Sequence, residues 1–283
     1  MPQAEANGVT IEYDILGPVD AEPVLLIMGL GGQMIRWTDG FRQALADHGY
    51  RVIRFDNRDV GLSTHFHEAP ALPYTLYDMA NDAAALLDVL GIERAHIVGV
   101  SMGGRIAQLV ASEHPHRTLS LTSIMSSTGN PALPAGTPEA IAALAVRPPS
   151  PFEDEEGFLA HAMRTARLIG SPGFPFDEAA EREQSLEATK RAYDPAGLAR
   201  QFAAVTATGD LRARLAIINA PTLVIHGAAD PLAPLAGGHD TAANIKGAKI
   251  EVIEGMGHDI PPALYEAIAR AIAAHAKAAR QPV

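Results

Sequence analysis

Hydrophobic positions along this chain gather into short continuous runs that are separated by amphipathic stretches. Continuous apolar runs are typical of strands that are buried on both faces of a sheet. An alternating segment at residues 9–15 predicts an antiparallel edge strand. The other expected strands are residues 24–28, 50–55, 96–98, 119–125, 222–226 and 249–253.

The stretches between these strands have the spacing and the end signals of helices. Gly49 and Gly91 each follow such a stretch directly, as residues that end helices do, and Thr75 stands where an N-cap is expected. The expected helices are residues 35–48, 75–90 and 104–110, with a closing helix around residues 264–272. Strands that alternate with helices predict an α/β fold whose mostly parallel sheet is covered on both faces.

The alternation of strands and helices breaks between residues 129 and 208. Prolines interrupt the first part of this stretch, and the remainder has helical composition without a strand candidate. We therefore expect a helical cap at residues 129–208, inserted between two strands of an α/β core that comprises residues 1–128 and 209–283.

The composition is that of a large folded domain. Of the 283 residues, 47% are hydrophobic and 19% are charged, which argues against a disordered chain. The formal net charge of −11 would repel a nucleic-acid backbone. The absence of cysteine excludes disulfides, thiolate metal sites and a cysteine nucleophile.

The N-terminal residues 1–7 have neither a basic start nor an apolar run, so we expect no secretory signal in them. The apolar run that follows at residues 24–30 is too short to span a bilayer. We expect a cytoplasmic protein that acts on a small molecule and binds neither nucleic acid nor membrane. The sequence leaves a homodimer open.

The pattern Gly-x-Ser-x-Gly at residues 99–103 lies between an expected strand and an expected helix. This context predicts a nucleophile elbow, a tight turn that raises the Ser101 hydroxyl above the sheet edge. The glycines are needed because the turn leaves almost no room for side chains on either side of the serine. The turn would also direct the backbone N–H of Met102 at a developing oxyanion. The alternative is a glycine-rich packing turn with an idle serine.

A nucleophilic serine needs a base, and the base needs a carboxylate that orients it. Asp230 and His258 each follow an expected strand, and they come after Ser101 in the order Ser, acid, His. Asp259 is an alternative acid, but a sequence neighbour seldom reaches the far ring nitrogen of the histidine. The loop at residues 126–130 is another place for the acid, and it holds no carboxylate.

The oxyanion hole needs a second backbone N–H, and the glycine-rich loop at residues 29–32 can approach a substrate closely. Leu30 is the candidate donor, although a residue on either side would also serve. Trp37 follows this loop, and we expect Trp37, Phe174 and Phe176 to bind substrate; for each of them core packing is the alternative.

His65 and His67 have a spacing that metal sites use, but no further ligand joins them in the sequence. We therefore expect no metal and no cofactor.

Four motifs together resemble the α/β-hydrolase superfamily with a helical cap, and the resemblance covers nearly the whole chain. They are DNRDVGLS at residues 56–63, GVSMG at 99–103, GAAD at 227–230 and GMGH at 255–258. The segments MGLGG at 28–32, GFPFD at 173–177 and DPLAP at 230–234 further resemble the aclacinomycin methylesterase branch. That branch removes a methyl ester from an aromatic polyketide.

The resemblance also implies that residues 56–58 are scaffold. Two positions depart from the family pattern: Met28 stands where many relatives have histidine, and Asp259 stands where an apolar residue is commoner. Both lie beside the expected site, so they bear on which substrate the pocket takes.

The predicted activity is hydrolysis of a carboxylic ester, with Ser101 as nucleophile, His258 as base, Asp230 as its orienting acid, and Leu30 and Met102 at the oxyanion. The same triad would also serve lactone opening, C–C bond hydrolysis or perhydrolysis, because fold and triad do not separate these reactions. A ligand receptor that keeps the triad but turns over negligibly is a third alternative.

Overall fold

The computed structural model describes residues 1–67 and 72–280, and in this part of the chain eight strands form one sheet. The strands are β1 (Gln3–Ala6), β2 (Val9–Leu16), β3 (Glu22–Ile27), β4 (Tyr50–Phe55), β5 (Ala95–Val100), β6 (Thr118–Ile124), β7 (Thr222–Gly227) and β8 (Lys249–Ile253). Their order across the sheet is β1-β2-β4-β3-β5-β6-β7-β8. The pairs β1–β2 and β2–β4 are antiparallel, and every later pair is parallel.

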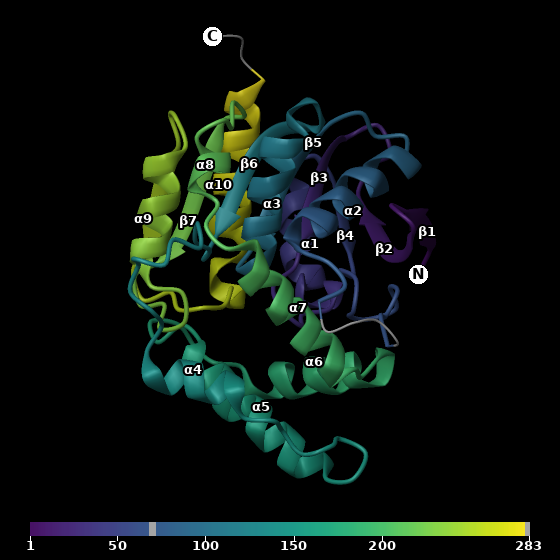
Figure 1. The fold of residues 1–283 in the computed structure, drawn as a ribbon, viewed down its shortest axis with the longest axis vertical. Coiled ribbons are helices and arrows are strands. Elements are labelled where there is room, and N and C mark those ends of the chain that lie inside the picture. The colour runs from purple at the N-terminus through teal and green to yellow at the C-terminus, as the bar shows by residue number, and fades with distance from the viewer. Residues whose placement is uncertain (68–71, 281–283) are drawn as a thin grey trace.

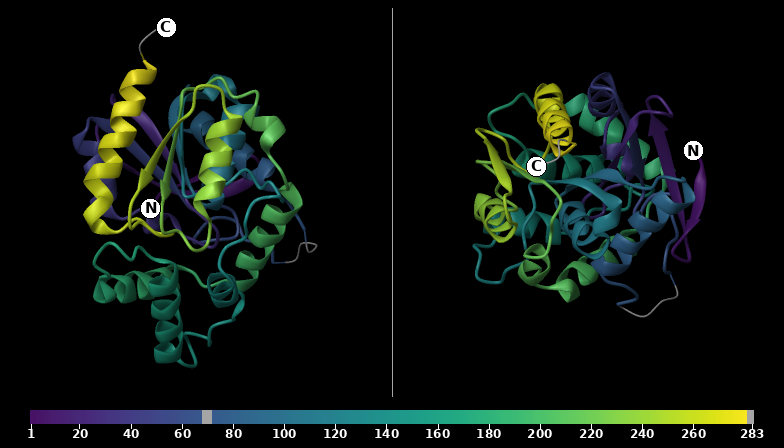
Figure 2. Two further views of the ribbon diagram at one scale, coloured as in Figure 1. Left: turned by 90° about the vertical axis from the view of Figure 1, so that its left-hand side faces the viewer. Right: turned by 90° about the horizontal axis from the view of Figure 1, so that it is seen from above.

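Helices cover both faces of this sheet, as the alternation of strands and helices predicts (Figures 1 and 2). The α-helices are α1 (Asp39–Asp47), α2 (Leu76–Val89), α3 (Met102–Glu113), α4 (Pro138–Ala145), α5 (Glu155–Ile169), α6 (Glu178–Arg191), α7 (Pro195–Thr208), α8 (Arg212–Leu215), α9 (Leu235–Asn244) and α10 (Tyr265–Ala279). Helices α2 and α3 enclose one hydrophobic core against the sheet, and α1 and α10 enclose a second core on the opposite face.

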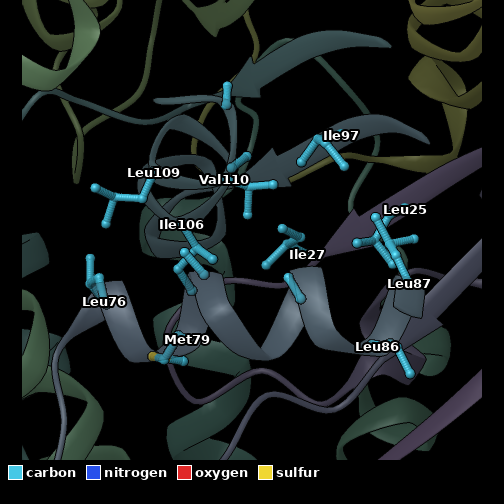
Figure 3. Packing of buried hydrophobic residues seen from close by; sticks show 14 of the residues in the cluster. Leu25, Ile27, Leu76, Met79, Leu86, Leu87, Ile97, Ile106, Leu109 and Val110 are labelled. Carbon is cyan, nitrogen blue, oxygen red and sulfur yellow. The ribbon is translucent and has the colours of Figure 1, made fainter. Parts of the chain in front are cut away.

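In the first core, the hydrophobic positions that recur along α2 pack against side chains of the neighbouring elements (Figure 3). Leu76, Met79 and Leu86 lie on one face of α2 and are fully buried against side chains of α3 and the central strands. The helix begins cleanly because the Asp78 carboxylate accepts a hydrogen bond of 2.7 Å from the N–H of the N-cap residue Thr75. The predicted helix at residues 75–90 is thereby confirmed.

Helices α4 to α7 lie between β6 and β7 in the chain, and Figure 1 shows α4, α5 and α6 grouped beyond one end of the sheet. Helices α5, α6 and α7 each begin after an aspartate whose side chain accepts a backbone N–H of the first turn. The inserted helices that the sequence predicts are thus present. The division into domains at residues 128/129 and 208/209 stays a prediction.

The N-terminal part of the sheet differs from the prediction. Residues 9–15 do not form the edge strand, because the four-residue strand β1 pairs outside β2. Asn7 and Gly8 both have positive φ values, of 52° and 75°, and form the tight turn that joins the two strands. An Asn-Gly pair is a recognised hairpin signal, so the sequence did contain this information.

The predicted single helix at residues 35–48 is also wrong. It consists of a 3₁₀ turn, Met34–Arg36, followed by helix α1, and Thr38 is the N-cap of α1. The Thr38 hydroxyl accepts the N–H of Phe41, which stabilises a new helix start in place of a continuous helix. Helix α4 was not expected among the prolines, yet Pro138 occupies the first helical turn, where proline is well tolerated.

Among the described helices, none combines the length and the apolar character that a bilayer crossing requires.

The two faces of α2 allow a stability test. Replacing Leu86, which is 0% exposed, with alanine should lower the free energy of unfolding by about 2–5 kcal/mol, because a buried side chain leaves a cavity. The same change at Val89, which is 53% exposed, should alter it by less than about 0.5 kcal/mol. Urea unfolding of Leu86→Ala and Val89→Ala measures both values. Equal losses would contradict the packing described here.

Candidate active site

Ser101 lies at the junction of β5 and α3 in a backbone conformation that few non-glycine residues adopt. Its φ is 55° and its ψ is −121°. A Cβ atom on Gly99 would overlap the carbonyl oxygen of Gly103, and one on Gly103 would overlap that of Ile27. Both glycines of the motif are therefore required for the strand and the helix to meet this closely.

Hydrogen bonds from β6 and the loop after it hold this junction. The Ser101 N–H donates to the Ile124 carbonyl oxygen at 3.0 Å, and the Ser126 hydroxyl donates to the Ser101 carbonyl oxygen at 2.7 Å. Strain of this kind costs about 1–3 kcal/mol and persists only where surrounding contacts impose it. Here those contacts place the serine hydroxyl at the carboxyl end of the central strand β5.

The structure brings Ser101, His258 and Asp230 into one hydrogen-bonded chain. His258 Nε2 lies 3.0 Å from Ser101 Oγ, and His258 Nδ1 lies 2.7 Å from Asp230 Oδ2. A carboxylate can only accept hydrogen bonds, so Nδ1 carries a proton and Nε2 is free to accept the serine proton. The buried Asp230 carboxylate is fixed in turn by the N–H groups of Leu232 and Ala233, at 2.9 and 2.8 Å from Oδ1.

Asp259, the alternative acid, points to a different partner. The Ser171 hydroxyl donates to the Asp259 carboxylate and accepts the Gly257 N–H at 2.9 Å. Burial raises the pKa of Asp259, and the hydrogen bond from Ser171 opposes that rise. In this geometry Asp230, rather than Asp259, contacts the ring of His258.

The loop that carries His258 after β8 is also held by the end of α5 and by the loop that follows it, and is called the histidine loop below. The His258 N–H donates to the Ile169 carbonyl oxygen at 2.7 Å, and the Gly173 N–H donates to the Gly255 carbonyl oxygen at 2.9 Å. Together with Ser171, these bonds join the inserted helices directly to the loop that carries the histidine.

The loop at residues 29–32 lies against the serine. A Cβ atom on Gly29 would lie 3.2 Å from the Ser101 Cβ, so only a glycine backbone fits comfortably at this distance. The Gly31 N–H is bound by the Gln201 side chain at 2.8 Å, and the Gly32 N–H closes a turn to the Gly29 carbonyl oxygen at 3.2 Å. The sequence left the residue on either side of Leu30 open as the oxyanion donor. The Gly31 N–H is occupied by Gln201, whereas the Gly29 N–H has no acceptor within the described residues, so Gly29 stays an alternative.

The backbone N–H groups of Leu30 and Met102 likewise have no acceptor within the described residues. Met102 is the first residue of α3, where an N–H has no intrahelical partner and where the helix dipole favours negative charge. Leu30 and Met102 as oxyanion donors stay a prediction.

The three residues expected to bind substrate lie in different environments. Trp37 is 2% exposed and stacks on Phe41 with ring centroids 5.1 Å apart, which is what the packing alternative predicts. Phe174 is partly buried against the same core, and the Phe176 ring lies 4.7 Å from the Arg167 guanidinium. A substrate contact for any of them stays a prediction. Phe152 is 77% exposed and so is not a core residue.

The segment at residues 56–59 joins the core to the inserted helices. The fully buried Asp56 pairs with Arg191 at 2.9 Å, and the fully buried Asp59 pairs with Arg200 at 2.7 Å. Arg191 is the last residue of α6, and Arg200 lies on α7. These pairings agree with the scaffold role that the resemblance implies for this segment. No local sequence signal identifies these partners, because more than a hundred residues separate the members of each pair.

His65 and His67 acquire a third neighbour that the sequence did not reveal. Asp194 Oδ2 lies 2.9 Å from His65 Nδ1 and 3.6 Å from His67 Nδ1. The same oxygen accepts a hydrogen bond of 2.9 Å from Arg200, and the two imidazole rings stack 8° from parallel. Parallel rings do not direct their nitrogen lone pairs at one point, and the carboxylate already has a cationic partner, so the group fits an ion-pair network better than a metal site.

The fold and the Ser-His-Asp arrangement define an α/β hydrolase. The sequence profile of the α/β hydrolase fold family matches residues 22–164, and the chain belongs to this family. The predicted fold class and the predicted family are therefore confirmed.

Particular relatives extend the comparison over the whole chain. Rhodomycin D methylesterase DauP from Streptomyces sp. (strain C5) is 34% identical, over 96% of this chain and 96% of its own length. 3-Oxoadipate enol-lactonase 2 from Acinetobacter baylyi is 29% identical, over 88% of this chain and 86% of its own length. The crystal structure of the enol-lactonase from Burkholderia xenovorans LB400 has a TM-score of 0.76 and 27% identity, and the match covers 98% of this chain and 100% of that one.

The strained backbone of Ser101 predicts an unusual order of stability. Glycine adopts this conformation without steric cost, so Ser101→Gly should unfold with a free energy about 1 kcal/mol higher than Ser101→Ala. At Ser112, inside helix α3, the order should reverse, because glycine destabilises a helix by about 0.5–1 kcal/mol relative to alanine. Chemical denaturation of the four variants measures this. If the alanine variant were the more stable one at Ser101 as well as at Ser112, Ser101 would not be strained.

Proposed function

We propose that this protein is a serine hydrolase that cleaves a carboxylic ester through an acyl-enzyme. The observation that carries the proposal is the hydrogen-bonded chain of Ser101, His258 and Asp230, at 3.0 and 2.7 Å, beside two free backbone N–H groups. The methylesterase relatives, similar over nearly the whole chain, support the same activity.

In the first step, Ser101 Oγ attacks the carbonyl carbon of the ester while His258 Nε2 takes the serine proton. Asp230 holds the imidazole ring in place and stabilises the positive charge that the ring acquires. The carbonyl oxygen becomes an oxyanion, and the N–H groups of Leu30 and Met102 stabilise it.

The tetrahedral intermediate then collapses. The bond to the alcohol oxygen breaks, and His258 returns its proton to that oxygen, which leaves the acyl group on Ser101. Water attacks the acyl-enzyme with His258 as general base, and the acid is released with the serine restored. The sum is ester plus water giving acid plus alcohol, and every proton passes through His258.

For the substrate, we propose a methyl ester of an aromatic or polyketide-like acid. The support is the resemblance to the aclacinomycin methylesterase branch together with relatives named as rhodomycin D methylesterases. A helical cap of residues 129–208 over Ser101 would favour a bulky apolar acid, because an enclosed site rewards buried apolar area. A lactone is the second candidate, since two of the similar proteins are enol-lactonases.

The acid of the triad can be tested by one matched pair of variants. Asp230→Asn should lower kcat for p-nitrophenyl butyrate by about 10³- to 10⁴-fold, because the amide favours the wrong histidine tautomer. Asp259→Asn makes the same chemical change one residue from His258 and should lower kcat by less than about tenfold. Ser101→Ala sets the background rate. A greater loss in Asp259→Asn would move the acid to that position.

The cap prediction concerns substrate ranking. Phe174→Ala and Phe176→Ala should change the kcat/KM ratios among a methyl ester of an aromatic acid, an aryl acetate, a simple lactone and a long-chain ester. The chemistry itself should be affected less, since neither residue belongs to the hydrogen-bonded chain of Ser101, His258 and Asp230. Wild-type protein should prefer the aromatic methyl ester to emulsified triolein. An unchanged ranking in both variants, or a preference for triolein, would refute a specificity role for this part of the cap.

A further inference from the structure

Gln201 is a buried polar residue of α7 that bridges two segments of the core. It is 0% exposed, and its Nε2 group donates to the Arg58 carbonyl oxygen at 2.7 Å. Its Oε1 atom accepts the Gly31 N–H at 2.8 Å. The amide orientation is fixed by its two partners, because a flipped amide would place oxygen against a carbonyl and nitrogen against an N–H.

The loop that Gln201 contacts has little stiffness of its own. Three of the residues at positions 29–32 are glycines, and Gly31 has a φ of 67°. Glycine peptides rotate with small steric cost, so such a loop adopts a single conformation only when outside contacts impose it. An oxyanion hole, in contrast, needs donors that are already in place before the charge develops.

Helix α7 supplies these contacts and is itself firmly anchored. Leu198 packs onto the loop so closely that a Cβ atom on Gly31 would lie 2.7 Å from its Cδ1 atom. Two residues later, Arg200 binds the buried Asp59 carboxylate through two hydrogen bonds of 2.7 and 2.9 Å. The helix therefore forms a fixed surface against which the loop is held.

The loop is tied to the inserted helices a second time at its far end. The Gln33 amide donates to the carbonyl oxygens of Ala188 and Ala192 at 2.7 and 3.0 Å, and Gln33 Oε1 accepts from Arg191 at 2.6 Å. The segment that carries Leu30 is therefore tied to the inserted helices at two points, Gly31 and Gln33.

We propose that Gln201 is a positioning residue for the oxyanion hole: by binding the Gly31 N–H, it holds the adjoining Leu30 N–H toward the ester oxygen beside Ser101. This inference rests on the proposed esterase function. It gives a residue of the inserted helices a part in the chemistry of the core, because that residue helps to complete the oxyanion hole.

The test replaces Gln201 with methionine, which has a similar shape and makes neither hydrogen bond. With p-nitrophenyl butyrate, kcat of Gln201→Met should fall by about 10- to 100-fold, since loss of an oxyanion donor costs about 10²- to 10³-fold. KM should change by less than about threefold, because the ground-state ester relies little on that donor. Trifluoroacetophenone, which adds to Ser101 Oγ to give a bound oxyanion, should inhibit the variant more weakly by a factor similar to the fall in kcat.

Two further variants separate positioning from general stability. Gln184→Met removes another glutamine of the inserted helices. Gln184 donates a hydrogen bond of 3.1 Å to the Ile35 carbonyl oxygen, which lies outside the loop at residues 29–32, so this variant should leave kcat and inhibition near wild type. In Gln201→Glu, burial raises the pKa of the introduced carboxyl group. The protonated acid can accept the Gly31 N–H and donate its O–H to the Arg58 carbonyl oxygen. This variant should keep kcat within about fivefold of wild type, and it also serves if the methionine variant does not fold.

The outcomes are distinct. If wild type is active and Gln201→Met keeps kcat and trifluoroacetophenone affinity within about threefold, the positioning role is wrong. Equal losses in Gln201→Glu and Gln201→Met, or in Gln184→Met and Gln201→Met, also overturn it. If wild type neither hydrolyses p-nitrophenyl butyrate nor binds trifluoroacetophenone, the proposed esterase function itself fails, and this inference fails with it.

Discussion

The backbone of Ser101, held at a φ of 55° and a ψ of −121°, is the constraint around which the candidate site is arranged. Nothing in the serine side chain favours that conformation. It is imposed by the close meeting of β5 and α3, which only Gly99 and Gly103 permit. Strands β5, β7 and β8 run parallel, so the loops that follow them lie at the same edge of the sheet. The loops after β7 and β8 therefore bring Asp230 and His258 to the serine, in the chain order Ser, acid, His.

Buried polar contacts bind the inserted helices to this core. Asp56 and Asp59 are fully buried carboxylates, and arginines at the end of α6 and on α7 neutralise them. Leaving either charge unpaired would cost about 3–5 kcal/mol, so these ion pairs specify where the helices dock. The same docking places Ser171 on the histidine loop and Gln201 on the loop of Leu30, which links the geometry of the reacting groups to the cap.

Local sequence signals predicted the central sheet and the residues that meet at its carboxyl edge. Buried parallel strands are continuous apolar runs, and the nucleophile elbow has a short motif, so both can be recognised without tertiary information. The break before α1 depends on one hydrogen bond to the Thr38 side chain, and strand β1 depends on a two-residue turn. Hydrophobic periodicity detects neither of these features. Gln201 could not be found at all, because its role arises from Gly31, 170 residues away in the chain.

The central claim is that Ser101 becomes acylated during turnover. A carbamate ester tests it directly, because a carbamoyl-enzyme hydrolyses far more slowly than an acyl-enzyme. Treatment with p-nitrophenyl dimethylcarbamate should release one equivalent of p-nitrophenol, with ester hydrolysis lost in parallel. Peptide mass spectrometry should place one dimethylcarbamoyl group on Ser101. A carbamoyl group on any other residue, or an active enzyme that hydrolyses esters and is never carbamoylated, would contradict the account.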